Sequence, residues 1–170
     1  GDAPYSGLVE AAFGTSLGDI LNSACGDAAK KLDVKALQVG GPSGGFIPAK
    51  HLDTAFDYAT LTELGAIVGS GSIVVKNHRK CIVDGTRAQV AFLAEESCGK
   101  CTVCREGLFA ANKILNRICE GNGVEKDIEA LSEIAEGLQV ASFCQFGKTA
   151  ANPIASSLRH FMDEYQAHIA

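Results

Sequence analysis

Three cysteines at C-x2-C-x2-C spacing are the feature that most constrains this chain. They are Cys98, Cys101 and Cys104, and a fourth cysteine, Cys144, follows 40 positions after the third. Thiolates are soft ligands that favour Fe–S clusters, zinc and Cu(I). Three sulfurs on one tight loop can bind three corners of a cubane, and a [4Fe–4S] cluster takes four thiolates. The spacing therefore predicts a [4Fe–4S] cluster held by these four cysteines.

Two other fates of the four cysteines stay open at this point. A structural zinc site usually takes its ligands from two C-x2-C pairs, whereas here the division is three and one. A chain with zinc at this position would be a zinc-stapled interaction module, that is, a protein-binding domain stabilised by the metal, rather than an electron carrier. The four side chains could also be unligated thiols. No C-P dipeptide follows Cys104 and there is no second cysteine run, so a two-cluster bacterial ferredoxin is not expected.

Composition narrows the class of protein. A chain of 170 residues with 46% hydrophobic content indicates a globular fold of one domain or two small ones. The net charge of −5 and the lack of a basic block argue against a nucleic-acid partner. No apolar run approaches the length of a membrane span, so we expect no direct membrane insertion. Seven cysteines, four of them in a ligand pattern, indicate a reducing compartment, and we expect the cytoplasm.

The first half of the sequence mixes short β-prone segments with helical ones. Apolar residues at helical spacing follow Thr15 or Ser16, either of which can cap a helix running to about Cys25, where Gly26 would end it. A second, short helix is expected from the capping-box pattern that begins at Thr60. Apolar and β-branched runs predict strands at 8–13, 36–39, 66–68 and 72–75. This half should form a small α+β sheet with one face covered by helix.

The second half, from Asp84 onward, has helical periodicity almost throughout. One helix should end at the cysteine loop, a second should begin just after Cys101, and a third should carry Leu131 and its apolar neighbours. A fourth should open at Asn152, where a Pro follows in the first turn, and run through Ile154, Leu158, Phe161 and Tyr165. Short links between amphipathic helices predict an antiparallel four-helix bundle.

This topology has a consequence for the cysteines. The link that holds residues 98–101 and the link that holds Cys144 would lie at the same end of an up-down bundle. The fourth sulfur would then meet the other three. The change from strand signals to helical periodicity also predicts two domains, at residues 1–82 and 83–170.

The surroundings of the cysteine loop suit a cluster. Gly99 and Gly147 would let backbone N–H groups approach the sulfurs. Positive charge from Lys100, Arg105 and Lys148 would favour addition of an electron, although each could equally be a solvated surface residue.

Other candidates are weaker. The glycine-rich segment 40–45 lacks the features of a phosphate loop and is better explained as a turn, with a ligand loop as the alternative. Cys25, Cys81 and Cys119 are expected to be buried small hydrophobic residues. His78, three residues before Cys81, could form a ligand pair with it but is better explained as a surface histidine. No catalytic residues are predicted.

Three motifs carry a resemblance to a known family. GPSGG at 41–45, ESCGKCTVCREG at 96–107 and SFCQFG at 142–147 resemble the NADH-binding flavoprotein subunit of respiratory complex I and of NAD(P)-linked iron hydrogenases and formate dehydrogenases. TAANP at 149–153 is more similar to the hydrogenase-type relatives. The resemblance covers essentially the whole chain but only the C-terminal part of such a subunit.

The resemblance implies a fold, cofactors and partners. It implies a soluble-ligand-binding β-grasp (ubiquitin-like) domain at about 4–80, then a helical [4Fe–4S] domain whose ligands are Cys98, Cys101, Cys104 and Cys144. In this family the cluster takes electrons from FMN after NADH has reduced the flavin. The FMN- and NADH-binding domain would precede residue 1, so we expect a fragment of a larger subunit. Its partners would be that domain and other Fe–S subunits of a complex, and the fragment alone would lack the FMN and NAD(P)H site.

Overall fold

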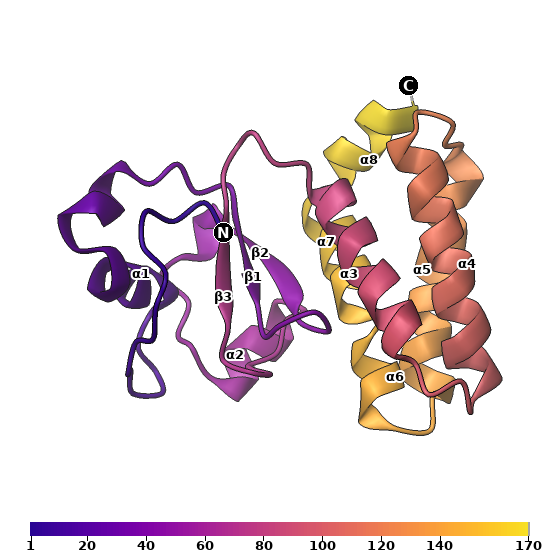
Figure 1. Cartoon of the computed structure of the whole chain (residues 1–170), viewed down its shortest axis with the longest axis horizontal. Helices are drawn as coiled ribbons and strands as arrows, with labels where there is room; N and C mark the ends of the chain where they lie inside the picture. The colour runs from indigo at the N-terminus through magenta and orange to yellow at the C-terminus, as the bar shows by residue number, and fades with distance from the viewer. Residues whose placement is uncertain (170) are drawn as a thin grey trace.

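A computed structural model describes residues 1–169 as a small sheet beside a bundle of helices (Figure 1). The sheet-containing half holds strands β1 (Ala36–Val39), β2 (Gly45–Pro48) and β3 (Ile73–Lys76), helices α1 (Leu17–Cys25) and α2 (Tyr58–Glu63), and 3-10 helices η1 (Gly26–Lys31) and η2 (Ala49–His51). The helical half holds α3 (Ile82–Glu96), α4 (Thr102–Cys119), α5 (Glu125–Ala141), α6 (Gln145–Thr149), α7 (Asn152–His160) and α8 (Met162–Ile169).

The sheet is antiparallel in the order β2-β1-β3. Central strand β1 is buried along its whole length, because successive side chains point to opposite faces and both faces are covered. Leu37 and Val39 pack in one apolar cluster with Leu17 and Leu21 of α1. Ala36, on the other face, packs in a cluster that includes residues of the helical half. The chain is therefore an α+β structure in which the sheet lies between α1 and the bundle.

The bundle is built from α3, α4, α5 and α7, which alternate in direction along the chain (Figure 1). Its core is one continuous apolar cluster, and its fully buried members include Val90, Leu108, Leu115, Leu131 and Ile154. No helix within residues 1–169 combines the length and the apolar character that crossing a membrane would need.

The two halves are joined by specific polar contacts. Edge strand β2 packs against α7, where the Ser156 hydroxyl accepts a hydrogen bond from the Phe46 backbone N–H at 2.9 Å. The Asn152 side chain donates to the Ser43 carbonyl at 3.0 Å. Lys35 and Glu164 form a half-buried ion pair at 2.6 Å. The first two contacts satisfy backbone groups of edge strand β2 and of the turn before it, which would otherwise be left unpaired.

Several sequence predictions for the first half are confirmed. The first helix begins after Ser16, whose side chain accepts a hydrogen bond from the Asp19 backbone N–H, and ends at Gly26 with φ 55°. The predicted strands at 36–39 and 72–75 correspond to β1 and β3. The turn at 40–45 is also present, with Gly40 and Gly41 at φ 89° and 87°.

Other predictions for this half are wrong. Residues 8–13 form no strand, because no strand of the described chain lies beside them, and Leu8 is fully exposed. Residues 66–68 form no strand either. Strand β2 was not predicted, because Gly and Pro are depleted in strands. The short helix begins at Tyr58 rather than after Thr60, because Asp57 caps it by accepting the Thr60 backbone N–H at 2.9 Å.

The second half departs from its prediction at two places. The predicted fourth helix is broken into α7 and α8 at Phe161, whose backbone leaves the helical region at φ −138° and ψ 37°. Phe161 packs with Phe46 of the sheet-containing half, whereas Tyr165 lies in the bundle core, so the break lets the two rings bury in different clusters. The short helix α6 was also not predicted.

Substitution of Ser156 with alanine tests the contact between the halves. It leaves the buried Phe46 N–H without an acceptor, so the free energy of unfolding should fall by about 1–3 kcal/mol. Urea denaturation followed by circular dichroism measures the change. Ser132→Ala, at an exposed site on α5, is the control and should change stability by less than about 0.5 kcal/mol. Equal effects of the two substitutions would contradict this account of the interface.

Candidate metal centre

All four predicted ligands lie at one end of the bundle. Cys98 is in the α3–α4 link, Cys101 is the N-cap residue of α4, and Cys104 is in the first turn of that helix. Cys144 is the N-cap residue of α6, in the short link that follows the end of α5 at Ala141. Because α3 and α5 both run toward this end, their C-terminal links meet there (Figure 1).

Backbone and electrostatic contacts show how close the two links are. The pKa of Cys101 is lowered chiefly because the Phe143 backbone N–H donates to its sulfur. A Cβ placed at Gly147, three residues after Cys144, would lie 3.5 Å from Cβ of Cys104, so the second link lies against the cysteine loop. The pKa of Cys104 is raised by burial, and negative charge on Cys101, Cys144 and Cys98 raises it further. The sulfurs are thus near enough to influence one another, and a cation between them would favour the thiolate forms.

Gly147 lets α6 pack closely against Ser142 and Cys104, because glycine has no Cβ atom. A Cβ atom there would lie 2.6 Å from both Cβ and Oγ of Ser142, and 3.5 Å from Cβ of Cys104. The Ser142 hydroxyl is buried and has no hydrogen-bond partner among the described residues. An unpaired buried hydroxyl is costly. We call the close packing at Gly147 the glycine cradle. Four thiols, this cradle and the unpaired hydroxyl together fit an iron–sulfur cluster.

Ser97 is a second hydroxyl at the site, and it was not predicted from the sequence. Its Oγ lies 3.4 Å from Sγ of Cys104 and accepts the Gly99 backbone N–H at 3.3 Å. Gly99 itself has φ 74°, a conformation that favours glycine, as the tight loop requires. The only sequence signal for Ser97 and Ser142 is their position one and two residues before Cys98 and Cys144.

Exposure divides the four cysteines into two pairs. Cys101 and Cys104 are buried, whereas Cys98 and Cys144 are exposed. No group of three or more His, Cys, Asp or Glu side chains within residues 1–169 is arranged to hold a single metal ion. Assignment of the four cysteines as ligands therefore stays a prediction, supported by their common location and their mutual electrostatic effects.

The basic residues near the loop behave differently from one another. Arg105 donates to the Gly99 carbonyl at 2.6 Å and pairs with Glu106 at 2.8 Å, so it braces the loop and its charge is partly balanced. Lys100 and Lys148 are exposed, and neither forms an ion pair with another described residue. Two positive charges thus remain free near the cysteines.

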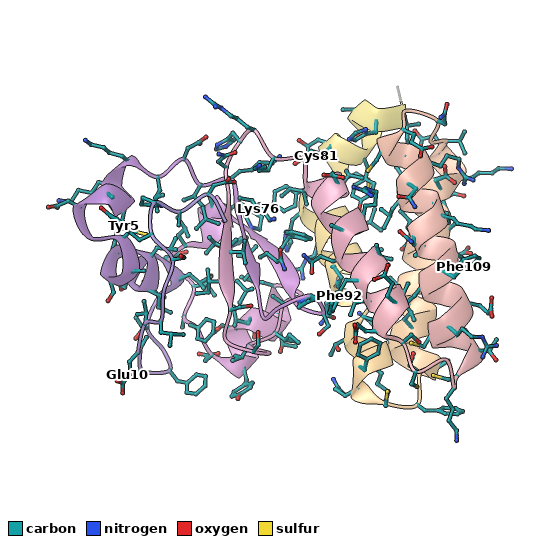
Figure 2. All side chains as sticks on the ribbon, viewed as in Figure 1. Tyr5, Glu10, Lys76, Cys81, Phe92 and Phe109 are labelled. Carbon is teal, nitrogen blue, oxygen red and sulfur yellow. The ribbon has the colours of Figure 1, made fainter. Side chains whose placement is uncertain are left out.

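The remaining cysteines lie elsewhere. Cys81 caps the start of α3, at the bundle end opposite the cysteine loop (Figure 2). Cys119 ends α4, which begins at the cysteine loop and runs away from it. Helices of 15 and 18 residues separate these two positions from the cysteine loop by about 22 and 27 Å along the helix axes. Cys25 is buried in α1, as predicted, but the prediction that Cys81 and Cys119 are buried is wrong, because both are partly exposed. His78 pairs with Asp33 and not with Cys81, whose sulfur instead lies 3.2 Å from Nε2 of His168.

Comparison with known families agrees with this geometry. Residues 84–168 match the family described as the NADH-ubiquinone oxidoreductase-F iron-sulfur binding region. The chain belongs to this family. The match begins in the first turn of α3 and ends near the end of α8, so it covers nearly all of the helical half, including the end that carries the four cysteines.

Individual relatives extend the similarity into the sheet-containing half. The HndC subunit of the NADP-reducing hydrogenase of Solidesulfovibrio fructosivorans is 38% identical over 163 residues, or 96% of this chain. An NADH-quinone oxidoreductase subunit of Mycobacterium bovis is 37% identical over 169 residues, or 99% of this chain. A solved structure of an NAD+-reducing [NiFe]-hydrogenase in the H2-reduced state covers 100% of the chain, with a TM-score of 0.87 and 32% identity.

The chain spans only part of each relative. It covers 33% of the hydrogenase subunit, 38% of the oxidoreductase subunit and 28% of the solved hydrogenase chain. These relatives support both the complex I and the hydrogenase resemblance.

Substitution of Gly147 with alanine tests the cradle. The added Cβ must displace Ser142, which shifts the link that carries Cys144, so the iron bound per chain after anaerobic reconstitution should fall at least about twofold with loss of stability. Gly137→Ala is the matched control, because its Cβ would lie 3.9 Å from the nearest atom, a Val103 methyl. It should keep its iron. Iron content in Gly147→Ala equal to that of the control would show that the cradle does not position the site.

Proposed function

We propose that this chain is an electron-transfer segment in which Cys98, Cys101, Cys104 and Cys144 hold a [4Fe–4S] cluster. The observation that carries the proposal is the meeting of the α3–α4 and α5–α6 links, in a chain of an iron–sulfur binding family. A cluster bound there would accept and donate one electron at a time. No observation favours the zinc-stapled interaction module or a small-ligand-binding role for the sheet-containing half.

The protein supplies the environment of the cluster. Backbone N–H groups in the loop, the Ser97 hydroxyl and the free charges of Lys100 and Lys148 all stabilise negative charge on sulfur. Each makes the addition of an electron more favourable. The exposure of Cys98 and Cys144 leaves the site open to a redox partner. Burial of Cys101 and Cys104 shields the opposite side from water.

The activity of the longer protein is part of the proposal. By similarity to oxidoreductase subunits, it would oxidise NAD(P)H through FMN bound in a separate domain and pass electrons to the cluster in this chain. Its partners would be that domain and other Fe–S subunits of a complex. We place it in the cytoplasm or on the cytoplasmic face of such a complex.

The organisation of the chain is likewise proposed. Residues 1–82 would be a β-grasp domain and residues 83–170 a cluster domain. Support comes from the separate apolar clusters of the sheet-containing and helical halves. The third cluster, which joins Phe46 to Phe161, and the bond from Phe46 to Ser156 make the contact between them extensive. The sheet-containing half would then serve to hold the cluster domain in place.

Single Cys→Ser substitutions test the ligand set. Serine replaces a soft sulfur with a hard oxygen, so each change at Cys98, Cys101, Cys104 or Cys144 should remove most of the iron measured per chain. Cys25→Ser and Cys119→Ser are the controls and should keep wild-type iron content. Iron loss in Cys119→Ser equal to that in Cys144→Ser would show that the fourth ligand is misassigned.

Anaerobic mixing with reductants tests what the chain does alone. Hydride transfer from NADH needs a two-electron acceptor, and no nucleotide-binding motif is present in the sequence. NADH alone should therefore leave the visible absorbance of the reconstituted chain unchanged, whereas dithionite or reduced FMN should bleach it. Rapid bleaching by NADH in flavin-free protein would place the oxidation of NADH in this chain and contradict the proposal.

A further inference from the structure

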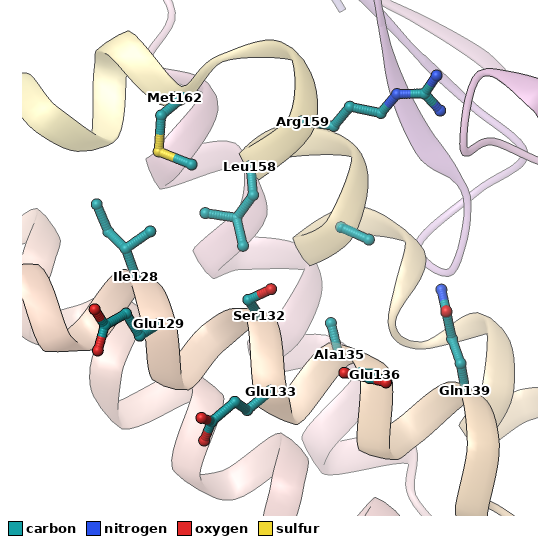
Figure 3. Close-up of a pocket in the computed structure, with 11 residues that line it drawn as sticks. Ile128, Glu129, Ser132, Glu133, Ala135, Glu136, Gln139, Leu158, Arg159 and Met162 are labelled. Atoms are coloured by element: carbon teal, nitrogen blue, oxygen red, sulfur yellow. The ribbon is translucent and has the colours of Figure 1, made fainter.

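A groove lies between α5 and the α7–α8 pair on the helical half (Figure 3). Its volume is about 740 Å³. The floor is apolar, and Figure 3 shows Leu158 and Met162 on one wall facing Ile128 and Ala135 on the other. Ile128 and Met162 are only partly buried, although their neighbours in the bundle core are fully covered. Apolar side chains left partly exposed in a groove between helices can seat the apolar face of a partner helix.

The α5 rim of the groove is acidic. Glu129, Glu133 and Glu136 are exposed at spacings of four and three residues, which places them along one side of the helix. None of the three forms an ion pair with another residue in the described chain. Like charges at these spacings destabilise a helix, so the free chain bears a cost that an external cation would relieve.

The opposite rim does not balance this charge. Arg159 is the groove's one basic lining residue, and it points away from α5 in Figure 3. Its guanidinium donates to the Glu63 carbonyl at 2.8 Å, in the sheet-containing half. The groove therefore combines an apolar floor with a rim that is negative on the α5 side.

The dimensions suit a helix. From Ile128 to Gln139 the groove follows α5 for about 16 Å, the length of three helical turns. Side chains at i, i+3, i+4 and i+7 of a helix can seat in a groove between two packed helices. The small side chains of Ala135 and Ala155 leave space for them. We propose that this groove binds an amphipathic helix of a partner protein, with an apolar face against the floor and Lys or Arg along the side facing α5.

A second copy of the chain is a poor occupant. In a two-fold symmetric contact the same surface faces itself, so the three glutamates of one copy would lie against those of the other. Repulsion between like charges across an interface disfavours that arrangement. A basic amphipathic helix can pair its Lys or Arg side chains with the three glutamates and pack its apolar face on the groove floor.

Binding of a designed peptide tests the proposal on the 170-residue chain. The test peptide is a fluorescent helical peptide of about 15 residues with leucines at i, i+3, i+4 and i+7 and flanking lysines. The control peptide has glutamates in place of the lysines. Fluorescence anisotropy at about 0.1 M salt gives both affinities. The lysine peptide should bind saturably, and the glutamate peptide should bind at least about tenfold more weakly.

Charge-reversal variants locate the site. Glu129→Lys/Glu133→Lys/Glu136→Lys should weaken binding of the lysine peptide at least about tenfold, because attraction becomes repulsion. The control Glu10→Lys/Asp53→Lys/Glu120→Lys changes the net charge equally at exposed sites outside the groove and should leave the affinity within about twofold. Ala155→Gln, which places a larger polar side chain in the groove, should also weaken binding, and circular dichroism checks that all variants fold.

Three outcomes would overturn the proposal. One is the absence of saturable binding by the lysine peptide. Another is an equal loss of affinity in the groove variant and the control, which would indicate attraction to net charge alone. The third is a dimer in sedimentation velocity that only the groove variant abolishes, which would make the occupant a second copy of the chain.

Discussion

Convergence of two interhelical links at one end of the bundle is the constraint on which the candidate site depends. The links meet because α3 and α5 run in the same direction and are held in register by a shared apolar core. Residues such as Leu115 and Leu131 are distant in sequence from the four candidate ligands, yet their burial decides where those cysteines lie. The α3–α4 link and the first turn of α4 bring three sulfurs together locally, while the fourth arrives only through tertiary packing. The site is therefore only as well formed as the bundle beneath it.

Polar groups at this end of the bundle fix the conformation of the cysteine loop, which the apolar core only positions. Ser97 and Arg105 hold the cysteine loop through Gly99, one by accepting its N–H and the other by donating to its carbonyl. Gly147, just after Cys144, lies against Cys104, so the second link packs on the cysteine loop. The buried Ser142 hydroxyl is left unpaired beside Gly147, a cost that protein interiors rarely bear without a purpose. A bound anionic cluster would provide the acceptor that the protein lacks.

Local patterns in the sequence predicted the helical half well and the sheet-containing half less well. Helical periodicity depends on the chain itself, so the cysteine loop and the start of α4 at Thr102 could be predicted. Strands depend on partners. The segment 8–13 has strand-like composition and no neighbouring strand, whereas β2 contains Gly and Pro and still pairs with β1. The break at Phe161 was missed because periodicity alone does not reveal that Phe161 and Tyr165 bury in different clusters. The candidate ligands could be chosen from spacing, but Ser97 and Ser142 became visible only in three dimensions.

Anomalous X-ray diffraction at the iron absorption edge, from crystals of the anaerobically reconstituted chain, tests the central claim most directly. The account predicts four iron positions in one compact group at the α6 end of the bundle, with density continuous to Sγ of Cys98, Cys101, Cys104 and Cys144. A single metal position, or iron bound near Cys81 and Cys119 at the opposite end, would contradict it.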